Sequence, residues 1–182
     1  MSNASVKTKW QDRILYVILQ VLHEPSVAFA LFFFIMLGMF SMVKPVNSED
    51  INFASLNLNL NLSEFLTYCY QNRNGRFFVQ TLYYYSNYLN NFWKWICSIC
   101  ITVCAFLIYK FTTYNKTFDN RDKTILAYLS CFSILIINFE ILSPSLFWVT
   151  GAYSYLIPYT VGLIGFSPFL FTLQSEDYKP KK

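Results

Sequence analysis

Four apolar segments restrict what this chain can fold into. They cover residues 26–43, 92–111, 124–142 and 155–173. Each is close to the ~20 apolar residues that an α-helix needs to cross the hydrocarbon core of a bilayer. The chain is 55% hydrophobic and only 13% charged, whereas a soluble domain is nearer to ~25% charged. The sequence therefore predicts an all-α membrane protein with four transmembrane helices, which together form a membrane domain over 26–173.

The lysines and arginines predict how these spans are oriented. They precede the first span, fill the connection 112–123 and its edges, and recur in the polar tail 174–182. Only Lys44, Arg73 and Arg76 lie in the long loop 44–91. Short cytoplasmic loops carry an excess of basic residues. Both termini and the 112–123 connection are therefore predicted to be cytoplasmic, and the 44–91 loop is predicted to lie outside.

The N-terminal region 1–25 contains an amphipathic stretch, "RILYVILQVLHEP". Ile14, Val17, Ile18, Val21 and Leu22 share one helical face, and cations precede them. This pattern predicts an interfacial helix on the inner leaflet. The alternative, in which the stretch simply extends the first span, remains equally open.

The outer loop 44–91 is predicted to carry one or two short amphipathic helices. Ser63 is a suitable N-cap before "EFLTYCYQ", and a second segment runs from about Arg76 to Tyr88. Their aromatic residues favour a position on the bilayer surface. Between them and the first span, "NLNLNL" (57–62) alternates with period two, which fits a half-buried strand or an irregular surface segment.

Three cysteines in the second span imitate a metal-binding motif. Cys97, Cys100 and Cys104 follow one another at helical spacing. However, a structural zinc site needs four ligands, and no histidine or acid lies near them in the sequence. We expect these side chains to serve helix packing, with no metal and no cofactor bound.

Several polar residues on the predicted outer face could carry chemistry. Glu49 and Asp50 follow the first span, where partial desolvation would raise the pKa of a carboxyl and make it a better base. Arg76 follows the turn signal Asn74-Gly75 and could bind a phosphate. The alternatives are solvated loop acids and an arginine whose side chain snorkels to the interface.

A second group lies near the third and fourth spans. Thr150-Gly151 would break the helix at headgroup depth, and Trp148 and Tyr155 offer aromatic faces for a sugar or an isoprenoid chain. Glu140 is an ionisable residue at membrane depth, and because such residues are costly to place there, a functional role is the first hypothesis for it. An ordinary aromatic belt and a snorkelling carboxylate are the alternatives.

These motifs together resemble a known family. The acidic pair, the N-G-R-F turn and the stretch W-x-T-G-x-x-x-Y-L-x-P (148–158) are similar to the N-terminal half of certain bacterial multi-span membrane proteins. Those are uncharacterised families related to the phage-type O-antigen glucosyltransferases, within the GT-C superfamily. The resemblance covers roughly 26–173. The family signature in the first loop is Asp-Asp, whereas this chain has Glu49-Asp50, so the main role is carried over to Asp50.

The resemblance implies transfer of a sugar from a polyprenyl-phosphate donor to a cell-surface polysaccharide, in the bacterial inner (plasma) membrane. It implies that Asp50 is the catalytic base and Glu49 its helper. It also implies that Arg76, with Asn74 and Gly75, holds the donor phosphate, and that the remaining candidates line the groove: Trp148, Thr150, Gly151, Tyr155 and Glu140.

The chain is shorter than such enzymes, which have at least about seven spans, so we expect the front half of a site, truncated or inactive alone. The expected partners are membrane lipids, a polyprenyl-phosphate sugar and a second membrane subunit, not nucleic acid. Two other readings remain open: a small four-span flippase, and a non-enzymatic membrane protein that binds a partner through its outer loop.

Overall fold

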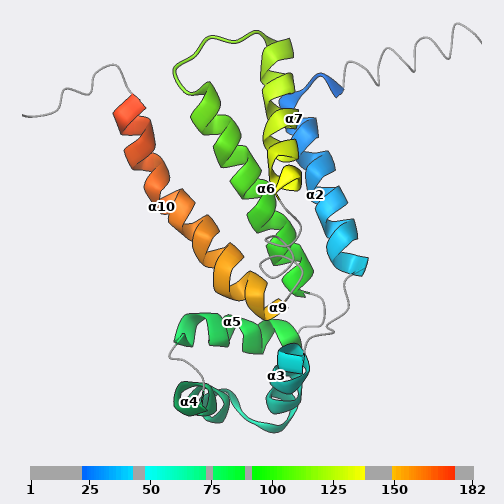
Figure 1. The fold of residues 1–182 in the computed structure, drawn as a ribbon, viewed down its shortest axis with the longest axis vertical. Coiled ribbons are helices and arrows are strands. Elements are labelled where there is room, and N and C mark those ends of the chain that lie inside the picture. Colours follow the sequence, from blue (N-terminus) through cyan, green and yellow to red (C-terminus); the bar gives the residue numbers. More distant parts are fainter. Residues whose placement is uncertain (1–21, 43–47, 73–75, 89–91, 138–148, 175–182) are drawn as a thin grey trace, which may run out of the picture.

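The fold is known from a computed structural model, which describes residues 22–42, 48–72, 76–88, 92–137 and 149–174 (Figure 1). All regular elements within these ranges are helices, which confirms the all-α class. The predicted interfacial helix falls within 1–21, outside the described residues. The tail beyond Gln174 also lies outside them.

Among the residues that the structure describes, three long helices are apolar enough to cross a bilayer. They are α2 (Pro25–Met42), α6 (Phe92–Thr113) and a helix over Val149–Leu173. The 22 residues of α6 give a length of about 33 Å, against a hydrocarbon core of about 30 Å. The first two agree with the predicted spans to within two residues.

The third predicted span, 124–142, is described only in part. Its described portion belongs to α7 (Asn120–Ile136), which has 17 residues. The first turn of α7 contains Arg121, Asp122 and Lys123. Residues 138–142 lie outside the described part of the chain.

The last long helix begins six residues before the predicted 155–173. It consists of α9 (Val149–Gly151), a π-helical turn η2 (Ala152–Leu156) and α10 (Ile157–Gln174). Pro158 and Pro168 do not interrupt it. A π turn widens the backbone. Since η2 ends two residues before Pro158, the wider turn gives the proline ring room and lets the helix continue.

The central helix of the bundle is α6. It packs against α2 and α7 on one side and against α10 on the other (Figure 1). Where α2 meets α7, Ala28 and Ala127 are buried beside Tyr109. Such small residues let helix backbones approach closely. A hydrogen bond also ties α7 to the segment just before α2: the Thr124 hydroxyl donates to the His23 carbonyl oxygen.

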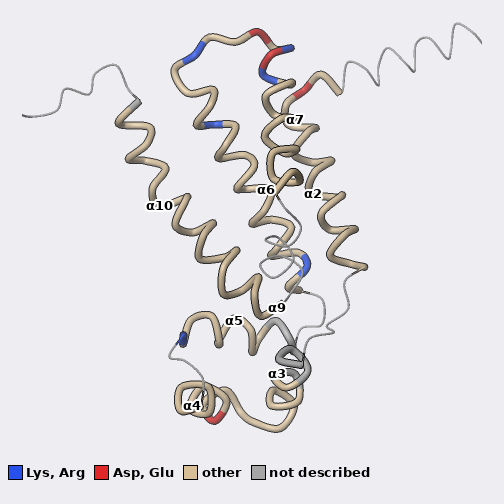
Figure 2. The backbone as a smooth tube through the Cα atoms, in the orientation of Figure 1, with Lys and Arg blue, Asp and Glu red and all other residues tan. Residues whose placement is uncertain are grey.

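Three short helices form a layer across one end of the bundle (Figure 1). They are α3 (Ser48–Asn59), α4 (Leu62–Asn72) and α5 (Phe77–Tyr88), and we call this layer the platform. Helix α5 contacts both α3 and α4. The opposite end carries the α6–α7 connection, where most of the Lys and Arg positions gather (Figure 2). We call it the basic end: Lys110, Lys116, Arg121 and Lys123.

The strand interpretation of "NLNLNL" is wrong, since its first half forms the end of α3 and its last residue begins α4. Its apolar contacts follow helical spacing: Leu56 and Leu60 pack on the core, and Asn57 is buried beside them. Asn59 closes the helix by donating from Nδ2 to the Ser55 carbonyl oxygen at 2.8 Å. The alternation was misleading because apolar residues four positions apart fit both the two-residue period of a strand and the 3.6-residue period of a helix.

The N-cap of α4 is Asn61 rather than Ser63. Asn61 Oδ1 accepts from the Glu64 backbone N–H at 3.0 Å, and Glu64 Oε2 accepts from the Asn61 N–H at 3.1 Å. This reciprocal pair is a capping box. Ser63 instead lies inside the first turn, where its carbonyl oxygen accepts a bond from the Thr67 hydroxyl.

Candidate functional site

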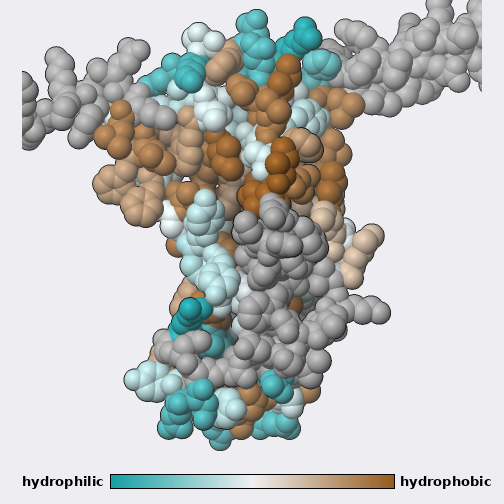
Figure 3. Space-filling view, viewed as in Figure 1, coloured by the Kyte–Doolittle hydropathy of each residue, from teal (hydrophilic) through white to brown (hydrophobic). Residues whose placement is uncertain are grey.

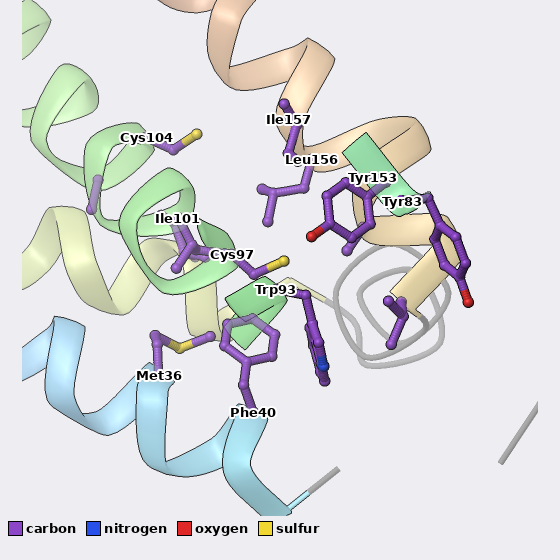
Figure 4. Close-up of a cluster of buried hydrophobic side chains, with 14 of the residues drawn as sticks. Met36, Phe40, Tyr83, Trp93, Cys97, Ile101, Cys104, Tyr153, Leu156 and Ile157 are labelled. Atoms are coloured by element: carbon purple, nitrogen blue, oxygen red, sulfur yellow. The ribbon is translucent and has the colours of Figure 1, made fainter. Parts of the chain in front are cut away.

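The platform meets the bundle at an aromatic junction. Tyr83 of α5 stands edge-on to Tyr153 of η2, with ring centroids 6.0 Å apart. Phe40 of α2 and Trp93 of α6 form a second such pair at 5.8 Å. All four side chains are buried, and Cys97 lies among them (Figure 4). We call these four rings the junction: they attach the platform to helices that come from three separate parts of the sequence.

Polar contacts hold the platform together beneath the junction. The Asn57 Nδ2 group donates to the Tyr84 carbonyl oxygen at 2.9 Å. The Tyr84 hydroxyl donates to the Leu60 carbonyl oxygen at 3.3 Å, and its ring packs on Phe65 at 5.4 Å. The buried Asn57 Oδ1 has no hydrogen-bond partner among the described residues. These contacts fix α5 relative to both other platform helices.

The acidic pair lies in the first turn of α3, where Glu49 and Asp50 are the second and third residues. Helix α3 contacts α9, which contains Thr150 and Gly151. The structure thus brings together two of the predicted segments that lie about a hundred residues apart in the sequence.

Arg76 is placed elsewhere on the platform. It is exposed and directly precedes α5, where its carbonyl oxygen accepts from the Gln80 N–H at 3.0 Å. That end of α5 points away from α9, whereas the end at Tyr88 lies towards it (Figure 1). A helix of 12 residues is about 18 Å long. The structure therefore does not bring Arg76 together with Thr150 and Gly151. Asn74 and Gly75 lie outside the described residues.

The predicted helix break at Thr150-Gly151 is wrong. Gly151 has helical dihedral angles, φ −64° and ψ −45°, and the chain continues into the π turn. Gly151 is buried and Thr150 half-buried, while Tyr155 is 54% exposed. Trp148 and Glu140 lie outside the described residues.

Sequence reasoning missed Tyr83 and Tyr153, which carry the junction. In "AYSYL" the sequence draws attention to both tyrosines equally, yet the structure buries Tyr153 and exposes Tyr155. Residues two apart lie on roughly opposite faces of a helix, so the helix that runs through the π turn puts only one of the two tyrosines against the platform. No pattern in the sequence signals that turn apart from the proline that follows it.

The three cysteines of α6 contribute to helix packing. Cys97 and Cys104 are buried, and Cys104 Sγ lies 3.3 Å from the Thr160 hydroxyl of α10. Within the described ranges, no group of three or more His, Cys, Asp or Glu side chains could hold a metal ion.

The surface divides into bands along the long axis (Figure 3). Hydrophobic side chains surround the long helices, and hydrophilic ones gather at the basic end and on the platform. Such a distribution fits a protein whose middle section faces lipid.

Comparison of the chain with protein-family models, with curated proteins and with solved structures finds no match.

Proposed function

We propose that this chain is an integral membrane protein that crosses the bilayer four times. Helix α6 ends at the basic end, whereas the last long helix begins at the platform (Figure 1). The chain between these two helices therefore has to cross the same thickness of bilayer in the opposite direction. Helix α7 supplies 17 residues on that path, about 25 Å of helix, packed on α2 and α6. With the basic end in the cytoplasm, the platform lies outside a bacterial plasma membrane.

The proposed activity is the binding of a lipid-linked sugar on the outer side, as the front part of a GT-C-type glycosyltransferase. One observation carries this proposal: the segments of the family resemblance, distant in sequence, adjoin one another. Helix α3 contacts α9, and Tyr83 of α5 packs on Tyr153 of η2. Their meeting point is the platform end of the bundle, where a lipid-linked substrate would reach the protein from the bilayer.

Each candidate residue has a role in this proposal. Arg76 holds the donor phosphate through charge-assisted hydrogen bonds. Asp50, assisted by Glu49, would accept the proton of the acceptor hydroxyl. The segment that contains Thr150 and Tyr155 would line the path of the donor.

The placement of Arg76 favours binding over catalysis by this chain alone. The sugar carbon that reacts is bonded directly to the phosphate oxygen, so a base has to act within a few ångströms of that phosphate. Arg76 precedes the end of α5 that points away from α9, whereas the acids belong to the helix that contacts α9. A second membrane subunit would complete the site.

The test is binding of a polyprenyl-phosphate sugar to the detergent-purified chain. Wild type is compared with Arg76→Ala, Asp50→Asn and the matched control Arg121→Ala at the basic end. A hydrogen bond to a charged group contributes about 1.5–3 kcal/mol, so Arg76→Ala should weaken binding roughly 10- to 100-fold. Asp50→Asn and Arg121→Ala should bind as wild type does.

Two results would contradict the proposal. Equal losses for Arg76→Ala and Arg121→Ala would mean that the phosphate contact is non-specific. No binding by any protein would favour the alternative of a non-enzymatic membrane protein that holds a partner, for which both Arg76 and Asp50 are replaceable.

A further inference from the structure

Helix α5 lies across the ends of the long helices rather than along them. Its two ends are at nearly the same height on the long axis of the molecule, and α4 lies farther from the bundle (Figure 1). Only residues 89–91 separate the end of α5 from the first residue of α6. Three residues span at most about 10 Å, so the end of α5 is tied closely to the start of a membrane-spanning helix.

The edge of the bilayer can be located along α6. A hydrocarbon core of about 30 Å accommodates about 20 residues of helix. Counted from the basic end at Thr113, the other boundary falls in the first turn of α6. Phe92 and Trp95 are about half exposed there, and Trp93 belongs to the junction. Aromatic side chains are enriched at this depth. Since both ends of α5 are at nearly the same height along the long axis of the molecule, its whole length lies at the level of the lipid headgroups.

One side of α5 is left uncovered by the rest of the protein. Phe78 is 67% exposed and Tyr85 52%, whereas the Phe77 ring lies 5.8 Å from that of Tyr70 in α4. Phe78 and Tyr85 are seven residues apart, which places them on the same face two turns from each other. Gln80 and Tyr83 are buried at 6% and 3%. A helix with large aromatic side chains on an exposed face and a cation at its end has the composition of an interfacial helix.

We propose that α5 is an interfacial helix of the outer leaflet, whose exposed face of Phe78 and Tyr85 lies at the boundary between headgroups and acyl chains. Arg76 then lies at the level of the lipid phosphates, to which a guanidinium can donate two hydrogen bonds. The occupant of this face is the phospholipid leaflet that surrounds the long helices. Helix α4 lies on the aqueous side of α5. This inference stands independently of lipid-linked sugar binding, because ordinary phospholipid suffices.

The experiment measures the depth of two positions in vesicles. The variants Phe78→Cys and Thr67→Cys are labelled with an environment-sensitive fluorophore and reconstituted into phosphatidylethanolamine–phosphatidylglycerol vesicles. Thr67 is the matched control, because it is exposed on α4. The native cysteines are buried or half-buried, so wild-type protein treated identically gives the background. Size-exclusion profiles in detergent confirm that both variants fold as wild type does.

The expected result is opposite behaviour at the two positions. The label at position 78 should have a blue-shifted emission, be quenched by lipids that carry a nitroxide near the headgroup, and resist quenching by aqueous iodide. The label at position 67 should be quenched by iodide and not by the lipids.

Two outcomes would overturn the proposal. Iodide quenching at position 78 as strong as that at 67 would mean that this face lies in water. Protection of position 78 from both quenchers would mean that protein covers it, either a partner or a second copy of the chain.

Discussion

The long helices and the platform satisfy their polar side chains differently. In the long helices, Ser98, Thr102 and Ser130 each donate a hydroxyl to the carbonyl oxygen four residues earlier in the same helix. In the platform, Thr67 and Thr81 make the same local bond, but Asn57 and Tyr84 also bond to segments more than twenty residues away. Lipid supplies no hydrogen bonds, so the local bond is the secure one inside a membrane. Platform helices of 11 or 12 residues are marginal alone in water and need tertiary contacts.

The two regions also differ in how much a buried apolar side chain contributes to the stability of the fold. In water, packing removes apolar surface from solvent, which stabilises the folded state. In lipid, the unpacked side chain is already in an apolar environment, so only close packing is gained. We therefore expect the same type of substitution to cost more in the platform than between the spans.

The largest effect is expected for Phe65→Ala, in the platform core. Phe65 is fully buried, and replacing such a side chain costs about 3–5 kcal/mol. Cys69 is buried one turn away and is the platform's single cysteine. Its labelling rate with a water-soluble maleimide should rise by about a hundredfold or more, since every 1.4 kcal/mol is tenfold. Leu58→Ala, on an exposed side chain of α3, is the control and should change little. Equal rates for both variants would exclude a packed platform core.

A smaller effect is expected for Ala127→Leu, where α7 meets α2. Ala127 and Ala28 are both buried, so a larger side chain has to separate the helices. Overpacking of this kind costs about 1–3 kcal/mol. The thermal midpoint of the detergent-purified protein should fall, whereas Ser133→Leu, at an exposed position of α7, should leave it nearly unchanged. An unchanged midpoint for Ala127→Leu would mean that α7 is loosely attached.

The capping box of α4 should give an effect of about 1 kcal/mol. Asn61→Ala removes the side-chain cap and should increase Cys69 labelling roughly fivefold. Glu64→Gln should keep most of the cap, because glutamine can also accept from the N–H of Asn61. If both variants increased labelling equally, the charge of Glu64 would matter more than its hydrogen bond.

The smallest effect is expected for Thr160→Val, at the buried contact between α10 and α6. The Thr160 hydroxyl lies beside Cys104 Sγ and donates to the Leu156 carbonyl oxygen at 2.8 Å. Interhelical hydrogen bonds in membranes contribute about 0.6 kcal/mol on average. A fall in the thermal midpoint larger than that of Ala127→Leu would reverse the comparison, because polar contacts would then hold the spans together.

Much of the fold was predictable from the sequence, and the errors of that prediction have physical reasons. Apolar length located α2 and α6 to within two residues, because solvation by lipid depends on composition along the chain. The same reasoning placed the start of the last helix at residue 155 instead of Val149, since it treated Thr150-Gly151 as a break. A π turn accommodates Pro158, and that geometry depends on the surrounding packing.

The candidate site was predictable only as separate segments. The acids of α3, the arginine before α5 and the Thr150-Gly151 pair were each visible as unusual residues near span ends. Which of them adjoin was not visible: α3 reaches α9, whereas Arg76 precedes the far end of α5. The buried pair Tyr83 and Tyr153 was missed because neighbouring tyrosines look identical in sequence.

The sequence by itself determined the helical class and the position of the long apolar helices. Those properties are local, since the length and composition of each segment fix the solvent that it prefers. The tertiary structure alone decided that α6 is central, that the platform rests on η2, and that Arg76 lies apart from the segments of α9. Those are long-range arrangements. They depend on how the surfaces of whole helices fit together, which no single segment encodes.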